Sequence, residues 1–218
     1  MKSIPTILFI LLIGCKSSTE NISSGDLLPL HEGNQWVYQT TFYNDSLPAI
    51  ITQDTSTIIG NSMKDGVNFY EMRKNRIIDF LSNQREGLWS VDTSTQKILL
   101  AYEYPSYPGN EYIAEYDTSS TDSSKTISEI RVNLLSTNEQ VITPAGNFNC
   151  YHYHCESEQV YFRINAIFQS VSITNYEQLK DIYFAPNIGI VKITVPRHIG
   201  IDSNNFRMTS VLKEYILK

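Results

Sequence analysis

Hydrophobic residues follow two patterns along this chain. An apolar run extends from Ile4 to Ile13, and from Glu32 onward apolar and polar residues alternate in short segments. Alternation with a period of two is typical of β-strands that bury one face. The segments expected to form strands are residues 32–38, 50–59, 67–73, 76–82, 88–92, 97–104, 111–116, 128–135, 140–143, 148–156, 160–168, 188–195 and 207–217.

Turn-forming residues separate these segments. Asp65-Gly66, Lys74-Asn75, Glu86-Gly87 and Pro108-Gly109-Asn110 are typical of hairpin connections. Gly146 and Gly189 stand in two further turns, where we predict a positive φ angle. No long segment with helical periodicity lies between the strands, so parallel pairing, which needs crossover connections, is not expected.

The sequence therefore predicts an all-β domain with a single antiparallel, strongly curved sheet or partly open barrel. A β-sandwich is the alternative, and few short helices are expected. Residues 175–180 could form a short helical turn, and residues 211–217 fit a helix or, as we prefer, a closing strand. Residues 117–125 and 197–205 are polar and are expected to form loops.

The apolar run near the amino terminus is typical of a secretory leader. Lys2 precedes it, Gly14 and Cys15 follow it, and it is about half as long as the ~20 residues of a membrane-spanning helix. A cation, a short apolar core and a small residue form the order of a cleavable signal peptide. We predict a leader over residues 1–14.

The string Leu12-Ile13-Gly14-Cys15 resembles the lipobox of bacterial lipoproteins. This resemblance implies cleavage before Cys15, a lipid (palmitate-type acyl chains) on this cysteine, and membrane attachment through that lipid. Residues 15–26 are rich in Ser, Thr and Asn and predict a flexible tether. Residues 27–218 are expected to form a single all-β domain. The expected location is the bacterial cell envelope, with the lipid anchored in the outer membrane.

The charge of the chain excludes one class of partner. Loss of Lys2 with the leader leaves 16 basic and 23 acidic residues in the mature chain. No cluster of Lys and Arg supplies the electrostatic attraction that dominates nucleic-acid affinity, so no nucleic acid is expected as a partner. Anionic lipid would also repel the chain mildly, which leaves the acyl chains as the attachment to the membrane.

Cys150 and Cys155 remain after the lipidated cysteine. On one extended strand their Cα atoms would lie roughly 16 Å apart, well beyond the ~7 Å limit for a disulfide. We predict that they do not pair with each other, and that they are thiols or form an intermolecular bridge.

Three further strings resemble the corresponding strings in a large group of uncharacterised Bacteroidota lipoproteins. They are the Pro-Leu-x-x-Gly-Asn-x-Trp-Val-Tyr string at residues 29–38, Thr143-Pro144-Ala145-Gly146-Asn147-Phe148, and the Tyr-Phe-Ala-Pro-x-Ile-Gly-Ile-Val-Lys string at residues 183–192. Their order spans most of the mature chain. The resemblance implies a secreted, lipid-anchored all-β domain with no assigned chemistry.

Two histidines form the one suggestive polar cluster. On a strand, His152 and His154 project from one face ~6.6 Å apart, while Tyr151 and Tyr153 project from the other. Such a pair suits two ligands of one metal ion if a third ligand comes from elsewhere. The plainer interpretation places both imidazoles on the solvent face with the tyrosines packed inward, and a pH-sensitive role is the third alternative.

Aromatic residues form a second cluster between residues 102 and 116. Cross-strand pairing on a half-buried sheet explains them, and a concave groove for an apolar ligand is the alternative. The candidate residues for contact with such a ligand are Trp36, Tyr102, Tyr104 and Tyr112.

No catalytic motif is present: Gly-x-Ser-x-Gly, His-Glu-x-x-His, Cys-x-x-Cys and a phosphate-cradling glycine loop are all absent from the sequence. We therefore expect a non-catalytic binding, carrier or structural module without a cofactor, whose partner is an apolar small ligand or an envelope protein. A metal-binding protein or metalloenzyme using His152 and His154 is the alternative. An apolar pocket supports the first, and a further acidic or histidine ligand beside both histidines supports the second.

Overall fold

The computed structural model describes residues 26–44, 47–121, 124–165, 170–196, 198–199 and 206–218. The predicted signal peptide (residues 1–14), the lipidated Cys15 and all of the predicted tether except Asp26 lie outside the described residues. So do the centre of the expected loop at 117–125 and most of the expected loop at 197–205.

One antiparallel sheet contains all the strands of the described residues. The strands are β1 (Gln35–Asn44), β2 (Leu47–Lys64), β3 (Val67–Lys74), β4 (Ile77–Gln84), β5 (Gly87–Val91), β6 (Ile98–Glu103), β7 (Glu111–Thr121), β8 (Ser124–Thr143), β9 (Gly146–Asn165), β10 (Ser170–Ala185), β11 (Gly189–Val195), β12 (His198–Ile199) and β13 (Phe206–Ile216). The path runs β6-β5-β4-β3-β2-β1-β13-β11-β10-β9-β8-β7, and β12 pairs with β10 beside this path.

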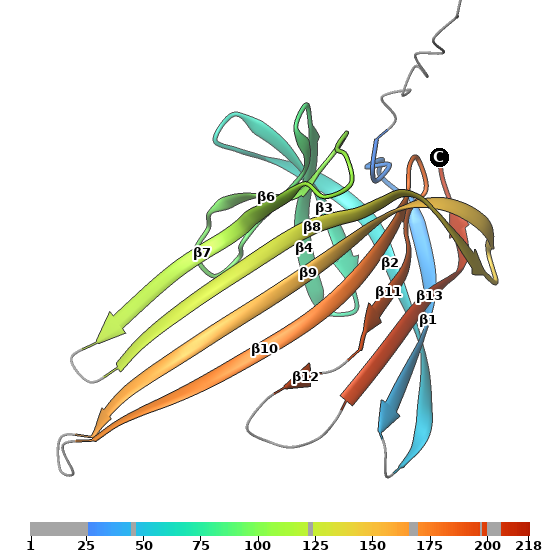
Figure 1. Cartoon of the computed structure of the whole chain (residues 1–218). Helices are drawn as coiled ribbons and strands as arrows, with labels where there is room; N and C mark the ends of the chain where they lie inside the picture. Colours follow the sequence, from blue (N-terminus) through green and yellow to red (C-terminus); the bar gives the residue numbers. More distant parts are fainter. Residues whose placement is uncertain (1–25, 45–46, 122–123, 166–169, 197, 200–205) are drawn as a thin grey trace, which may run out of the picture.

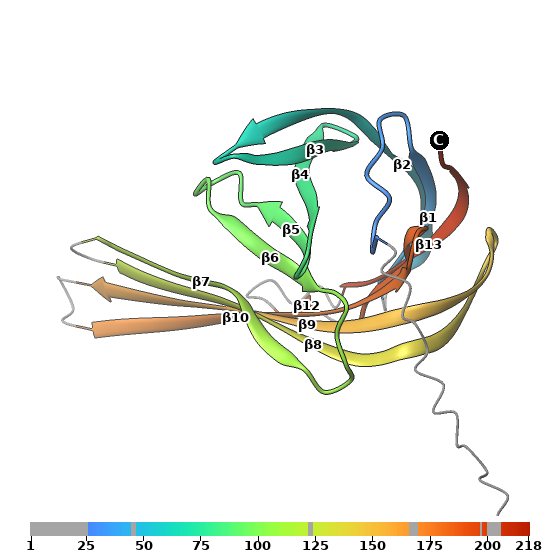
Figure 2. The ribbon, with the colours of Figure 1, turned by 90° about the horizontal axis from the view of Figure 1, so that it is seen from above.

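The sheet curls into a nearly closed barrel with one seam (Figures 1 and 2). The seam lies between the two end strands, β6 and β7, which are close in space but are not paired as a ladder. The predicted all-β class and partly open barrel are thus confirmed.

Bulges and turn glycines bend the strands into this shape. The ladders shift register at six places along the barrel wall and at two more in β8, between Leu134 and Ser136 and between Ser136 and Glu139. Such bulges increase local twist and bending. Gly146 and Gly189 have φ angles of 142° and 101°, which confirms the positive values predicted for both turns.

The structure corrects three boundary predictions. Residues 175–180 belong to β10 and do not form a helical turn, and no helix of any kind occurs among the described residues. The two segments expected at 128–135 and 140–143 join in β8. The described residues of the polar segment, 117–121 and 124–125, belong to β7 and β8. Strand pairing decides these cases, because β9 supplies partners along the whole length of both neighbours.

The barrel is filled by side chains and by the segment that precedes β1. This segment lies inside the ring in Figure 2, and its Leu27, Leu28 and Leu30 are at most 4% exposed. Asn187 N–H donates to the Asp26 carbonyl (2.8 Å), and Asn83 Nδ2 donates to the Leu28 carbonyl (2.7 Å). The segment therefore acts as an internal plug whose backbone is bound to two parts of the wall.

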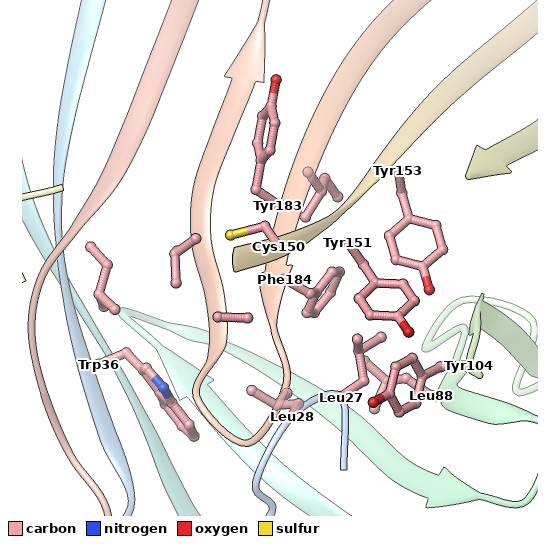
Figure 3. Packing of buried hydrophobic residues seen from close by; sticks show 14 of the residues in the cluster. Leu27, Leu28, Trp36, Leu88, Tyr104, Cys150, Tyr151, Tyr153, Tyr183 and Phe184 are labelled. Carbon is pink, nitrogen blue, oxygen red and sulfur yellow. The ribbon is translucent and has the colours of Figure 1, made fainter. Parts of the chain in front are cut away.

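Aromatic residues form the centre of the core around the plug (Figure 3). Trp36 and Phe184 are fully buried, and Tyr153 packs edge-on against Phe184 with ring centroids 5.9 Å apart. Tyr151 and Tyr153 face inward, as the sequence pattern predicted.

Four strands extend beyond the barrel. Figure 2 shows β7, β8, β9 and β10 continuing to one side of the ring as a nearly flat sheet. We call this part the wing, and it comprises residues 115–121, 124–131, 156–165 and 170–179. The wing lacks the curved opposite wall that covers the inner face of the barrel.

Candidate functional site

A cavity of about 180 Å³ opens into the barrel beside the plug. Most of its wall is aliphatic or aromatic, and the walls come from β1, β2, β3, β4, β11, β13 and the plug. The lining residues are Leu28, Trp36, Tyr38, Ser56, Met72, Lys74, Asp79, Ile190, Ile193 and Ser210. This lumen cavity is the principal candidate for a ligand site.

Two aromatic residues of β1 present their apolar surfaces to the lumen cavity because their polar atoms are already bonded. Trp36 Nε1–H donates to the Ile188 carbonyl at 2.6 Å, and the Tyr38 hydroxyl donates to the Ile190 carbonyl at 3.0 Å. Burial raises the pKa of Tyr38 well above its ordinary value, so the hydroxyl remains protonated and continues to donate. These bonds fix both rings against β11.

The charged groups of the lumen cavity are Lys74 and Asp79, which come from neighbouring strands at its rim. Asp79 is exposed, but partial burial of its carboxyl group raises its pKa, while the charge of Lys74 lowers it. The rim can thus interact with a polar end of a ligand whose apolar part lies deeper.

The structure separates the four aromatic candidates for ligand contact. Trp36 lines the lumen cavity, whereas the other three lie at the seam. Tyr102 packs against Phe184 and Tyr153 with centroids 4.8 and 5.2 Å apart, and burial raises its pKa well above the ordinary value. A direct role in ligand contact stays a prediction for all four.

Tyr112 joins the two ends of the sheet. Its hydroxyl accepts from Glu103 N–H and donates to the Ala101 carbonyl, both at 2.9 Å. Tyr153 also reaches the seam, where its hydroxyl donates to the Glu103 carbonyl at 2.6 Å. Side chains therefore supply, at the seam, hydrogen bonds that a regular ladder would otherwise make.

His152 and His154 project from the outer face of β9, but they are not simply solvated. His152 Nδ1 lies 2.7 Å from Glu139 Oε2 and its Nε2 lies 3.2 Å from Asp181 Oδ1. His154 Nδ1 lies 2.7 Å from the same Asp181 oxygen. The His152 ring also stacks on Tyr183 at 4.2 Å, and its side chain is only 13% exposed.

Asp181 therefore meets one condition of the metal hypothesis, since it contacts both histidines. Each histidine nevertheless has a ring nitrogen occupied by a carboxylate, and the region the structure describes contains no group of three or more His, Cys, Asp or Glu residues arranged to hold a metal ion. The cluster is better described as a hydrogen-bonded network that ties β8, β9 and β10 together.

The two cysteines are buried, unpaired thiols, which confirms that they do not form a bridge with each other. Burial raises the pKa of Cys150 to about 12 and also raises that of Cys155. Since the thiolate is the reactive form, neither cysteine is suited to nucleophilic chemistry.

Several lumen residues were not among the sequence candidates. Met72, Ile190 and Ile193 lie on strands whose inward face the pattern could indicate, but their meeting with Trp36 depends on pairing across the sheet. Tyr38 was within reach, because it shares a face with Trp36 by the period-two rule.

Comparison with known proteins gives a fold and no activity. No protein-family model matches this chain, and no curated protein matches it. A solved protein from Parabacteroides distasonis ATCC 8503, provisionally described as a lipoprotein, aligns with a TM-score of 0.50 and 12% identity over 88% of this chain and 99% of that chain. An exported protein with a YmcC-like fold from Bacteroides fragilis NCTC 9343 aligns with a TM-score of 0.47 and 13% identity, over 88% and 100% of the two chains.

The likeness to the Parabacteroides protein shows a shared fold. Among the residues described, no helix is long and apolar enough to cross a membrane.

Proposed function

We propose that this chain is a lipid-anchored cell-envelope lipoprotein of the Bacteroidota type, and that it is a non-catalytic module that binds an apolar ligand in the lumen cavity. The Leu12-Ile13-Gly14-Cys15 string supports the anchor. The description of one fold relative as a lipoprotein supports the same location. Attachment to the outer membrane through lipid on Cys15 is part of the proposal.

The lumen cavity is the observation that carries the binding role. Its lining combines Trp36, Tyr38 and Met72 with two isoleucines, and the only ionisable groups beside Tyr38 are Lys74 and Asp79 at the rim. Ligand sites in proteins are typically apolar with a few placed polar groups.

The size of the lumen cavity limits the ligand. Apolar cavities of ~150 Å³ hold one benzene-sized ring, and the lumen cavity measures about 180 Å³. It fits a single aromatic ring or the end of an acyl chain, with a polar end group at Lys74 and Asp79. A whole lipid does not fit inside it.

Calorimetric titration with hexanoic acid, which is small enough for the lumen cavity, tests this role. We expect saturable binding of hexanoic acid to the wild-type protein. Met72→Trp fills the lumen cavity and should abolish this binding, whereas Arg73→Trp on the opposite face of β3 should not. Equal binding by both variants, with unchanged thermal midpoints, would refute a ligand site in the lumen.

The metal-binding alternative rests on one observation, the contact of Asp181 with both His152 and His154. Calorimetric titration with zinc separates the two functions. Stoichiometric, submicromolar binding that disappears in the His152→Ala, His154→Ala double variant would favour the metal role.

A further inference from the structure

The outer face of the wing is an exposed sheet face with an ordered arrangement of charged and apolar rows. It continues the face on which His152 and His154 lie, because side chains two residues apart along β9 share a face. In the order from barrel to tip, the rows across β8, β9 and β10 are Arg131-Glu156-Leu179, Glu129-Glu158-Glu177, Ile127-Val160-Asn175 and Lys125-Phe162-Ile173.

The second row places three glutamates directly opposite one another. Glu158 pairs in register with Glu129 on one side and with Glu177 on the other. Like charges in directly opposite positions destabilise a sheet. Arg131 contacts Glu129 and lies 3.8 Å from Glu156. The first two rows together thus contain four carboxylates and one cation, Arg131.

These carboxylates surround a shallow depression of about 200 Å³, whose wall is formed by Glu129, Arg131, Glu156, Ser157, Glu158 and Glu177. Within the described part of the chain they do not converge on a metal position. A planar, extended cation fits such a depression better than a single ion, because guanidinium bonds to carboxylates in a bidentate manner.

Apolar side chains adjoin the carboxylates on the same face. Ile173 is 61% exposed, and Ile127, Val160 and Phe162 are half-buried. A partner for this face must therefore carry cations and, about two residues along a strand (~7 Å) away, large apolar side chains.

The tip of the β3–β4 hairpin of the same chain carries that combination. Arg73 and Arg76 are exposed, and the adjoining Ile77 and Ile78 are 64% and 39% exposed. Arg73 pairs with Ile78 across the hairpin, so a cation and an isoleucine share one face. The hairpin tip is narrow enough to enter a depression, as a flat sheet is not.

We infer that the outer face of the wing binds the β3–β4 hairpin tip of a second copy of this chain. Arg73 and Arg76 of that copy bond to the carboxylates around the depression, and its Ile78, on the same face as Arg73, covers the adjoining apolar row with Ile127 and Val160. The contact also neutralises the carboxylate row that destabilises the isolated wing.

The contact is heterologous, since two different surfaces meet. A pair of copies keeps one unused hairpin tip on one copy and one unused wing on the other, so further copies add head to tail into rings or filaments. One hairpin tip buries less area than a standard stable interface, which makes the contact weak and sensitive to salt.

Charge reversal with complementation tests this contact. Full-length protein is solubilised in a density-matched non-ionic detergent and its sedimentation coefficient is measured against concentration. The wild type should associate as concentration rises and dissociate at high salt. The Glu158→Lys, Glu177→Lys variant and the Arg73→Glu, Arg76→Glu variant should each stay monomeric, at least about tenfold beyond the concentration at which the wild type associates.

Mixing the two reversed variants in equal amounts should restore association. The unaltered hairpin tip of the wing variant meets the unaltered wing of the hairpin variant, and the two reversed surfaces are also complementary in charge. Failure of the mixture to associate, or a wild type that stays monomeric at every concentration, overturns the inference. Binding of the wild-type wing to another protein without self-association overturns it equally.

A milder pair of variants controls for folding and net charge. The first double variant is Glu158→Gln with Glu177→Gln, and the second is Gln159→Lys with Gln178→Lys. Both change the net charge by the same amount, but the positions of the second pair lie on the other face of the same strands. The first pair should weaken association and the second should not. Equal effects of the two pairs would show a general charge effect and overturn the site.

Discussion

Gly189 holds the β10–β11 turn in a conformation that side chains rarely adopt, and it does so where the turn packs closely against Leu28 and Trp36. Its φ angle is 101°, and a Cβ atom there would lie 2.4 Å from Leu28 Cδ1 and 3.4 Å from Trp36 Nε1. Glycine therefore serves both the backbone angle and the close approach of the plug.

Gly189→Ala should lower the free energy of unfolding by roughly 2 kcal/mol or more, through backbone strain and overpacking against Leu28. Urea titration of the purified protein measures this. Gly66→Ala is the matched control, because its φ angle is 80° and no atom lies within 4 Å of the added Cβ; it should lose about 1 kcal/mol. Similar losses at the two positions would show that crowding is not involved.

His152 behaves as a structural residue in this environment. Its ring lies between Glu139 and Asp181 and stacks on Tyr183. The plainer interpretation of the sequence placed both imidazoles on the solvent face, whereas the His152 side chain is only 13% exposed and contacts a carboxylate at each ring nitrogen.

His152→Ala should reduce stability by about 1–3 kcal/mol, because it removes the imidazole that bonds Glu139 and one of the two imidazoles that contact Asp181. His154→Ala should cost less, since that side chain is 25% exposed against 13% for His152. Thermal unfolding of the two single variants compares them directly, and a larger loss for His154→Ala would contradict the network described here.

At the scale of the elements, the seam explains how an open sheet behaves as a barrel. The end strands share no ladder, yet Tyr112 and Tyr153 bond to the backbone of residues 101–103 from the opposite side. The Asn110 amide also bonds to the Glu103 carboxylate. Side chains of β7 and β9 thus protect the edge of β6 from pairing with other chains.

Tyr112→Phe should open this seam locally, because it removes a donor and an acceptor together. We expect a loss of about 1–3 kcal/mol and faster hydrogen exchange at the Glu103 amide. Tyr116→Phe on the same strand is the control, since Tyr116 is 56% exposed. Unchanged exchange at Glu103 in Tyr112→Phe would show that the seam is held by other contacts.

At the scale of the whole molecule, the plug lies between the proposed lipid anchor and the barrel. The described chain begins at Asp26, whose carbonyl accepts from Asn187 N–H, and the following leucines enter the lumen. Residues 15–25 therefore separate the proposed lipid from a firmly bound part of the fold by at most roughly 40 Å of extended chain.

Cys15→Ala should prevent lipidation and release the protein from the membrane fraction, because two or three acyl chains are what anchor such a protein. Metabolic labelling with a radioactive fatty acid, followed by fractionation, measures both effects. Incorporation equal to that of the wild type would exclude Cys15 as the lipid site. Cys150→Ala serves as the control, since that thiol is buried.

The candidate site was only partly accessible from the sequence. Trp36 was a candidate and lines the lumen cavity, whereas Ile190 and Ser210 of the same wall were not candidates. Trp36 and Tyr38 are bonded to residues 152 positions away along the chain. No local pattern reports contacts of that separation, which is why the cavity could not be derived from periodicity.

The sequence by itself determined the local features of this protein: the strand-rich class, the antiparallel pairing, the two turn glycines, the inward tyrosines of β9 and the separation of the two thiols. Each depends on neighbouring residues, through side-chain alternation, turn chemistry or strand length. Only the tertiary structure decided that the sheet closes at a tyrosine seam, that the leucines before β1 fill the barrel, that residues 175–180 form a strand, and that β7–β10 project as a wing. These features depend on which distant strands pair and on which side chains meet across the lumen, and that information is distributed over the whole chain.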